Sequence, residues 1–471
     1  MCIRDRIPND QNGHTEDKVA KNPSFARLRR IWETTRNFWQ EVLPTDQDRN
    51  LSQSLVGEVL GLAGPRLEIR GALHPQRPGD TIGPYHAYEL VLPRGVRLSV
   101  VWDEEKKRFI TADNLDYLSS DRQLGRPVQG VLQGDVKLAI EEAAGYGAKN
   151  KVWGTITIQD FQELPDQYLP AIPILAEPRT FMALMPADKS LELIKRIKNK
   201  YEGEMGKVRN RLPLHLGCVY AHRHTPIRAL LDAGRAMLSG SRKEEEAEVK
   251  DVTPRECKDD NWPTERQITL CLRGRDIRLT VPTMMGDNTT PDLWYPYWRV
   301  EGKATNRTRW FIGPEGEHWV HVCDLKQGDI VHLSPSSFDF EYLDTTARRF
   351  EIHYDENGRR ARRSRPYYLE DLDRLEELWG HMKRLSKTQR HQVVRTIEAT
   401  REAWYGQDPD GQSTKDEVFK RFVADTLAQA EWKEENFWNN LHDDEREELI
   451  QAGVRGELTD LAELHMEILK E

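Results

Sequence analysis

The stretch from residue 174 to residue 238 constrains the fold of this chain more than any other part, because its apolar residues switch between the periods of strands and helices. Two strand patterns meet at a proline-containing turn, and two helical patterns flank a third strand. The predicted elements are a strand hairpin that turns near Glu177 to Arg179, a helix at about 189–201, a strand at 214–221 and a helix at 226–238. The sequence therefore predicts the order strand, turn, strand, helix, strand, helix.

This order is the skeleton of a polymerase or nucleotidyl-cyclase palm. In a working palm, the tight turn between the first two strands carries paired carboxylates that hold two divalent cations over a nucleoside triphosphate. The four residues at the turn of this chain are Ala176, Glu177, Pro178 and Arg179. The sequence thus predicts a palm scaffold whose metal-binding turn has been replaced, and it predicts no catalytic residue and no metal ligand there.

Around this turn the chain resembles the large subunit of type III CRISPR–Cas effector complexes, whose second palm carries a Gly-Gly-Asp-Asp hairpin and makes cyclic oligoadenylates. It is most similar to the divergent, type III-C-like branch in which the cyclase motif is degraded. The resemblance rests on residues 175–238 and 334–352, and it covers the chain from about residue 151 to the C-terminus. When the hairpins are aligned, neither metal-binding aspartate of the family is present in this turn.

The resemblance implies a non-catalytic subunit that scaffolds an RNA-guided complex in antiviral defence. Its implied partners are guide RNA, target RNA, and the CRISPR backbone and small helical subunits. No cofactor is implied, although residual binding of ATP or magnesium stays open. An HD-type nuclease, which needs an adjacent His-Asp pair with further histidines, is expected to be absent.

Two alternative functions remain. A residually active nucleotidyl cyclase would need Glu177 and a carboxylate from another strand, but the fixed positive charge of Arg179 would compete with the metal ion. A stand-alone RNA-binding or regulatory protein would use the palm pattern only as a common ferredoxin-like fold.

Length and charge indicate a soluble protein with several domains. The chain has 471 residues, whereas single cores stop growing at roughly 250–300 residues. Its net charge of −9 argues against a surface dominated by a nucleic-acid groove, so any RNA contact must be local. Five dispersed cysteines without Cys-x-x-Cys spacing indicate a reducing cytoplasm, and no apolar run is long enough to predict a membrane partner. The first six residues look unlike a natural start, so we expect an N-terminally truncated fragment; a short disordered N-terminus is the alternative.

The predicted fold class is α+β, with a ferredoxin-like palm domain, accessory β-rich regions and a C-terminal α-helical bundle. Within it we expect a helix at 25–42, a short helix at 135–144 and a charged, flexible connector at 239–251. The predicted domains are an N-terminal helical segment (1–50), a β-rich domain (51–150), the palm-like degenerate cyclase domain (151–240), a linker with a second β-rich region (241–368) and the helical bundle (369–471).

Two basic segments are candidates for RNA contact, because arginine can bind phosphate through two parallel hydrogen bonds. The first is the connector between palm helix and strand, and the second follows a predicted turn at Asn357-Gly358. Their cations are Lys207, Arg209 and Arg211 in the first segment, and Arg359, Arg360, Arg362, Arg363 and Arg365 in the second. Solvated loops paired with acidic neighbours are the alternative. The aromatic residues at 294–298 and 310–311 can either stack on unpaired bases or belong to a core.

Overall fold

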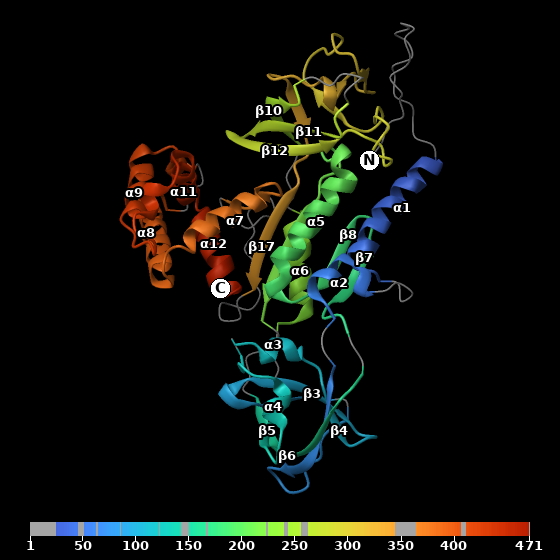
Figure 1. Cartoon of the computed structure of the whole chain (residues 1–471), viewed down its shortest axis with the longest axis vertical. Helices are drawn as coiled ribbons and strands as arrows, with labels where there is room; N and C mark the ends of the chain where they lie inside the picture. The colour runs from blue at the N-terminus through green and yellow to red at the C-terminus, as the bar shows by residue number, and fades with distance from the viewer. Residues whose placement is uncertain are drawn as a thin grey trace. The chain divides into compact units, whose positions relative to one another are not determined.

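The computed structural model shows a mixed α+β protein with a helical C-terminal region (Figure 1). It describes residues 25–45, 51–62, 65–84, 86–121, 123–142, 150–165, 168–222, 225–239, 244–255, 262–343, 364–406 and 411–470. The chain forms two compact units, one made of Arg29–Leu193 and His222–Pro226, the other of Met1–Leu28, Ile194–Ala221 and Ile227–Glu471.

A closed six-stranded barrel forms most of the first unit, with strand order β1-β4-β3-β2-β5-β6. Its strands are β1 (Leu67–Pro75), β2 (Ala87–Val91), β3 (Arg97–Asp103), β4 (Arg108–Thr111), β5 (Lys137–Glu142) and β6 (Lys151–Glu163). Two short helices, α3 (Leu115–Ser119) and α4 (Val128–Leu132), lie between β4 and β5 in the sequence. Alternating side chains of the strands fill the barrel with one apolar core.

The prediction of a helix at 135–144 was wrong, because this segment contains β5. Leu138 and Ile140 are 5% and 0% exposed and alternate with more exposed neighbours, as in a strand with one buried face. β5 pairs with β2 on one side and β6 on the other, and this pairing outweighs the helical preference of its Ala, Leu and Glu residues. The expected domain boundary after residue 150 therefore falls inside the barrel, since β6 closes it.

The first unit also contains α1 (Phe25–Val42), α2 (Leu55–Leu60) and a hairpin of β7 (Ile172–Glu177) and β8 (Thr180–Leu184). The predicted helix at 25–42 and the predicted hairpin are both confirmed. Trp39 of α1 stacks on Phe181 of β8, with ring centroids 4.8 Å apart. This contact fixes α1 against the two-stranded sheet.

In the second unit, α5 (Ser190–Met205), β9 (His215–Ala221) and α6 (Ile227–Ser239) confirm the other predicted elements of the 174–238 stretch. β9 pairs in parallel with β17 (Ser337–Leu343), which in turn pairs with β18 (Tyr367–Tyr368). A ferredoxin-like palm sheet would also join the hairpin strands to β9. Among the described strands, β7 and β8 form a sheet of their own and β9 lies in the three-stranded sheet.

A seven-stranded sheet with the order β12-β11-β10-β16-β13-β15-β14 forms the larger β region of the second unit. Its strands are β10 (Glu245–Thr253), β11 (Glu265–Leu272), β12 (Arg275–Pro282), β13 (Tyr297–Val300), β14 (Trp310–Ile312), β15 (His318–His321) and β16 (Ile330–Leu333). One face of this sheet carries a continuous apolar core.

The expectation of a flexible connector at 239–251 was wrong for its second half, because β10 is an interior strand of this sheet. Ala247 and Val249 are 2% and 0% exposed, whereas the charged residues between and around them lie on the other face. The alternation of apolar and charged residues is a strand pattern, which the density of charge obscured.

Helices dominate the C-terminal region, as predicted. They are α7 (Asp371–Met382), α8 (Lys387–Tyr405), α9 (Glu417–Ala428), α10 (Phe437–Asn440), α11 (Asp443–Arg455) and α12 (Glu457–Ala462), which continues as a π-helical turn over Glu463–Ile468. In the described part of the chain, no helix combines the length and apolar character needed to cross a membrane.

Candidate functional site

The β7–β8 turn has the compact form that the sequence predicts. Glu177 pairs with Thr180, so Pro178 and Arg179 alone make the connection. Glu177 and Arg179 are exposed, whereas Ala176 is 5% exposed and its carbonyl accepts a hydrogen bond from Gln40 Nε2 at 3.4 Å. The turn therefore presents one carboxylate and one guanidinium to its surroundings.

A metal-binding site at this turn would need more acidic ligands than Glu177 supplies, because a magnesium ion prefers several oxygen ligands. Within the described ranges, no three or more His, Cys, Asp or Glu side chains are grouped so that they could hold a metal ion.

Two cations of the basic connector form internal ion pairs. Lys207 lies 2.7 Å from Asp292, which is 1% exposed. Arg209 is 4% exposed and contacts Glu370 and, at 3.3 Å, Glu202. The guanidinium of Arg209 therefore binds carboxylates of its own chain and is not presented to an external phosphate, contrary to the expectation for this connector.

Arg211 has a different environment. It donates hydrogen bonds to the carbonyls of Tyr297 at 2.8 Å and Tyr295 at 2.7 Å, and its guanidinium carbon lies 5.7 Å from the centre of the Trp319 ring. Burial lowers the pKa of Arg211 to about 10, so it remains charged at neutral pH. The negative charge of nearby Asp292 offsets part of this effect of burial on the pKa of Arg211.

Of the second basic segment, Arg359, Arg360, Arg362 and Arg363 lie outside the described residues. Arg365 is described, and it is only 8% exposed. It lies 3.4 Å from Asp460 and 3.1 Å from Glu463, donates to the Phe340 carbonyl, and stacks over the Phe340 ring at 3.9 Å. Arg365 is thus an internal contact between β17 and the C-terminal helices, and not the projecting loop residue that we expected.

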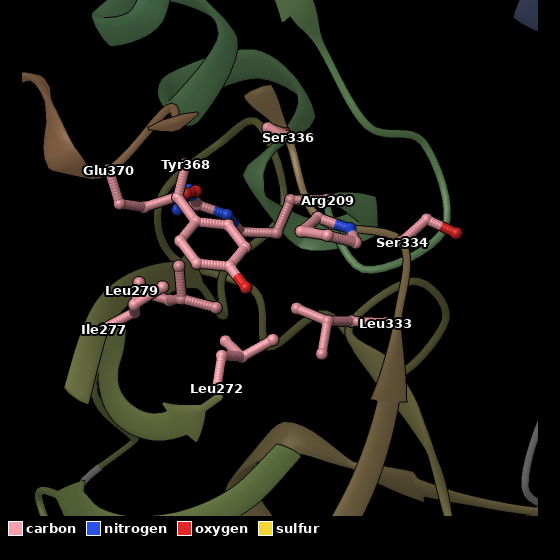
Figure 2. A pocket seen from close by; sticks show the side chains of 10 residues that line it. Arg209, Leu272, Ile277, Leu279, Leu333, Ser334, Ser336, Tyr368 and Glu370 are labelled. Atoms are coloured by element: carbon pink, nitrogen blue, oxygen red, sulfur yellow. The ribbon is translucent and has the colours of Figure 1, made fainter. Parts of the chain in front are cut away.

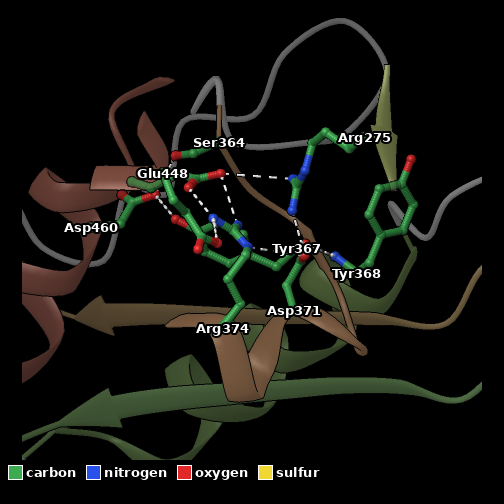
Figure 3. A network of polar contacts seen from close by, with 9 residues as sticks. Arg275, Ser364, Tyr367, Tyr368, Asp371, Arg374, Glu448 and Asp460 are labelled. Carbon is green, nitrogen blue, oxygen red and sulfur yellow. Dashed lines mark hydrogen bonds and ion pairs between the residues drawn. The ribbon is translucent and has the colours of Figure 1, made fainter. Parts of the chain in front are cut away.

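A larger polar network joins β12 and β18 to the C-terminal helices (Figure 3). Arg374 of α7 donates to both oxygens of Glu457 at 2.8 and 3.1 Å, and Tyr367 donates to Asp460 at 2.7 Å. Arg275 of β12 binds Asp371 of α7. Glu457 and Asp371 are 2% and 5% exposed, so the network is largely buried. Its partners are far apart in sequence, and no local pattern could have revealed them.

The pocket beside this network is small (Figure 2). The Tyr368 ring points into a space bounded by the apolar side chains of Leu272, Leu279 and Leu333, and Arg209 and Glu370 line its polar side. The space has room for about one water molecule. It is therefore a packing gap between sheet and helices, and not a nucleotide pocket.

The chain does contain an adjacent His-Asp pair, which an HD-type nuclease would need, because His442 is followed by Asp443. The pair lies at the start of α11, where the backbone N–H of His442 donates to Glu445 Oε2 at 2.9 Å. Both residues are exposed. The geometry is that of a helix start, and the metal cluster of a nuclease is not found there.

The predicted aromatic clusters divide between core and surface. Trp298 and Trp310 are 0% and 9% exposed and belong to the core of the seven-stranded sheet. Tyr295 is 37% exposed, and Phe311 and Trp319 are partly exposed on the opposite face. Tyr297 lies on that opposite face too, but it is 1% exposed and packs against Phe311. Sequence alternation along β14 and β15 could have separated the two groups, since neighbouring residues of a strand face opposite sides.

Comparison of the chain with family models, with curated proteins and with solved structures finds no match.

Proposed function

We propose that this chain is a non-catalytic large subunit of a type III CRISPR RNA-guided interference complex. In this role it scaffolds the complex in the cytoplasm and contacts guide and target RNA together with backbone and small helical subunits. The observation that carries the proposal is the β7–β8 turn, a two-residue connection occupied by Pro178 and Arg179.

The element order supports this proposal. A hairpin followed by helix, strand and helix is the order in which a ferredoxin-like palm is built, and β7, β8, α5, β9 and α6 follow it. The proposal includes the palm itself, as a degenerate cyclase domain in which the hairpin strands and β9 would share one sheet in the assembled particle. The helical C-terminal region supports a role in assembly, because α-helical surfaces commonly pack against other subunits.

The proposed lack of nucleotidyl-transfer activity follows from the charges of the side chains at the β7–β8 turn. Nucleotidyl transfer by two metal ions needs carboxylates that hold cations on both the attacking and the leaving oxygen. Arg179 places a permanent positive charge at the turn, and Glu177 is the only acidic group of its four residues. A divalent cation would be repelled by Arg179 and held too weakly by Glu177 alone.

Co-expression tests the proposal. The full chain, tagged, is produced with type III backbone and small subunits and a repeat-spacer array, and the purified material is analysed for protein and RNA. We expect a stoichiometric particle that contains guide RNA. A tagged acidic protein of similar net charge serves as the control for nonspecific capture.

Two outcomes would contradict the proposal. A chain that purifies without the backbone subunits is not their large subunit. A chain that purifies alone with RNA lacking repeat-derived sequence would instead be a stand-alone RNA-binding or regulatory protein.

A further inference from the structure

The connection between α7 and α8 holds a buried guanidinium that has no polar partner. Arg390, the fourth residue of α8, is 8% exposed. In the part of the chain that the structure describes, its guanidinium makes no ion pair and no hydrogen bond, and its Nε is fully buried without an acceptor. The other buried arginines that are described each contact a carboxylate or a backbone carbonyl: Arg108, Arg209, Arg266, Arg365 and Arg401. Burying a charge is costly unless it is paired, so Arg390 lacks a partner that its environment calls for.

An aromatic ring meets part of this need. The Cζ of Arg390 lies 5.1 Å from the centre of the Trp379 ring of α7, and Trp379 is itself 2% exposed and stacked on His465 at 4.5 Å. The ring attracts the positive charge, but it offers no lone pair to the five N–H donors of a guanidinium. Trp379 lies three residues before the end of α7 at Met382, so the guanidinium above it lies where α7 ends and α8 begins. We call residues 383–390 the α7–α8 junction.

The first turn of α8 adds further donors to this junction. Ser386 caps the helix by accepting from the N–H of Gln389 at 3.3 Å, which leaves the N–H groups of Lys387 and Thr388 without an acceptor among the described residues. The turn contains no acidic residue and begins with the exposed Lys387. Helical side chains lean toward the helix N-terminus, so Arg390 reaches toward this turn. A helix N-terminus attracts anions, and here the attraction adds to that of two cations.

The sequence around the junction is basic in an otherwise acidic chain. Residues 378–397 contain five Lys or Arg residues and no Asp or Glu, although the net charge of the protein is −9. The nearest described carboxylate from another segment is that of Glu434, which pairs with the exposed Arg384. Its neighbours Glu431 and Glu435 are exposed and make no described ion pair with the junction. Positive charge at the junction is therefore left uncompensated by the chain itself.

We propose that the α7–α8 junction is a binding site for a phosphate group, either free or at the end of an oligonucleotide. The terminal nitrogens of Arg390, which are not fully enclosed as Nε is, donate to two phosphate oxygens. The N–H groups of Lys387 and Thr388 donate to a third oxygen, and the Lys387 ammonium balances the second charge.

Geometry selects the ligand. A tetrahedral phosphate presents three oxygens to donors that come from a side chain and from a helix end, whereas a carboxylate has only two oxygens in one plane. A phosphodiester within a strand is flanked by two sugars, which suits a guanidinium that is 8% exposed less well than a terminal group does. The site does not depend on the proposed function, since it rests on α7 and α8 alone.

The first experiment titrates the full chain with inorganic phosphate, and with acetate at equal ionic strength, by calorimetry. We expect phosphate to bind and acetate to bind more weakly. Arg390→Met keeps the length of the side chain and its packing on Trp379 but removes the donors, and it should weaken phosphate binding about tenfold or more. Arg390→Lys keeps the charge without the planar fork and should lie between the two. Arg395→Ala is the matched control, since it removes an exposed arginine from the same helix.

Thermal unfolding separates a ligand site from a purely structural arginine. Without phosphate, Arg390→Met should be at least as stable as the parent, because it removes an unpaired buried charge. Phosphate should raise the Tm of the parent and of Arg395→Ala but not that of Arg390→Met. Hydrogen exchange of the parent alone needs no variant: phosphate should slow exchange of the amides in the first turn of α8. Equal phosphate effects on the parent and Arg390→Met, or unchanged exchange in this turn, would overturn the site.

The source of the phosphate is tested by competition against inorganic phosphate. An oligoribonucleotide with a 5′-phosphate is compared with the same oligoribonucleotide ending in a 5′-hydroxyl group. Displacement by the phosphorylated form alone identifies a nucleic-acid end as the ligand, and displacement by neither form identifies the free anion. Equal displacement by both forms, or acetate binding as tight as phosphate binding, would overturn the assignment of a terminal phosphate. These measurements use no CRISPR subunit, so their failure is distinguishable from failure of the proposed function.

Discussion

Arg209 and Arg365 show at the scale of single residues how a predicted nucleic-acid contact can be a buried ion pair. Their positions in basic segments suggested phosphate binding, yet each is surrounded by carboxylates from distant parts of the chain. Removing a guanidinium from water is costly, and only paired charges and hydrogen bonds offset that cost. Of the partners named here, only Glu202, which contacts Arg209, lies nearby in the sequence.

Replacing Arg365 should therefore destabilise the fold. Arg365→Ala removes the buried guanidinium that contacts Asp460 and Glu463, and we expect a loss of about 3–5 kcal/mol in the free energy of unfolding. Urea unfolding monitored by fluorescence measures it. Lys207→Ala, at a partly exposed pair, should cost less. Unchanged stability of Arg365→Ala combined with weaker RNA binding would return Arg365 to the RNA contacts.

His321 should make the second unit sensitive to acid. It is 0% exposed, its Nε2 donates to the Asp292 carbonyl at 2.9 Å, and its Nδ1 accepts from the Cys323 N–H at 3.1 Å. Burial lowers the pKa of His321 to about 4. The unfolded chain takes up this proton near pH 6.5, so stability is unaffected above that pH and falls as the pH drops from 6.5 to 4, by about 3 kcal/mol in all.

The measurement is urea unfolding at pH 7.5 and pH 5, for the parent and for His321→Gln. The variant should be less stable at pH 7.5 but should lose less stability on acidification, because its side chain does not titrate. Asp292, Arg309 and Arg266 surround His321 and are common to both proteins, so the difference isolates the histidine. An equal loss in both proteins would show that other groups cause the pH dependence.

At the scale of elements, β10 provides the clearest test of the fold. Val249 is 0% exposed in the sheet core, whereas Lys250 beside it is 42% exposed at its side chain. Val249→Ala should cost about 2 kcal/mol through lost burial and the cavity it leaves, and Lys250→Ala should be close to neutral. Denaturant unfolding of the two variants measures this. If both were neutral, the segment would be a solvated connector after all.

Elements with local periodicity could be predicted from the sequence, and those defined by pairing could not. The β7–β8 hairpin, α1 and α6 follow from their own apolar spacing. β5 and β10 were missed because helix-favouring or charged residues obscured their alternation. The parallel pairing of β9 with β17 joins segments more than 100 residues apart, and nothing local specifies it.

The same distinction between local patterns and long-range strand pairing applies to the candidate site. The composition and tightness of the Ala176–Arg179 turn could be predicted because a two-residue hairpin is a local structure. The proximity of Arg299, Trp319 and Phe311 could not, since these residues become neighbours only through the register of three strands. Sequence spacing grouped Phe311 with Trp310, yet the sheet places these two residues on opposite faces.

For the whole molecule, the decisive prediction concerns catalysis. The type III complex proposed above, given ATP, magnesium or manganese and cognate target RNA, should produce no cyclic oligoadenylate above background, because the turn presents Arg179 where the proposal needs a second carboxylate for catalysis. Pro178 also removes a backbone donor from the same turn. Chromatography of the products decides it, with a related complex that has an intact Gly-Gly-Asp-Asp hairpin as the positive control.

The Glu177→Ala variant tests whether the β7–β8 turn is inactive or is a weak active site. If the turn is inactive, the variant and the parent complex should give the same background and assemble equally well, since Glu177 is exposed and its loss leaves no buried group unpaired. Target-dependent oligoadenylate that disappears in Glu177→Ala would make Glu177 a metal ligand and the chain a cyclase. Product that persists in the variant would have to come from a site other than this turn, because the remaining residues of the turn contain no carboxylate.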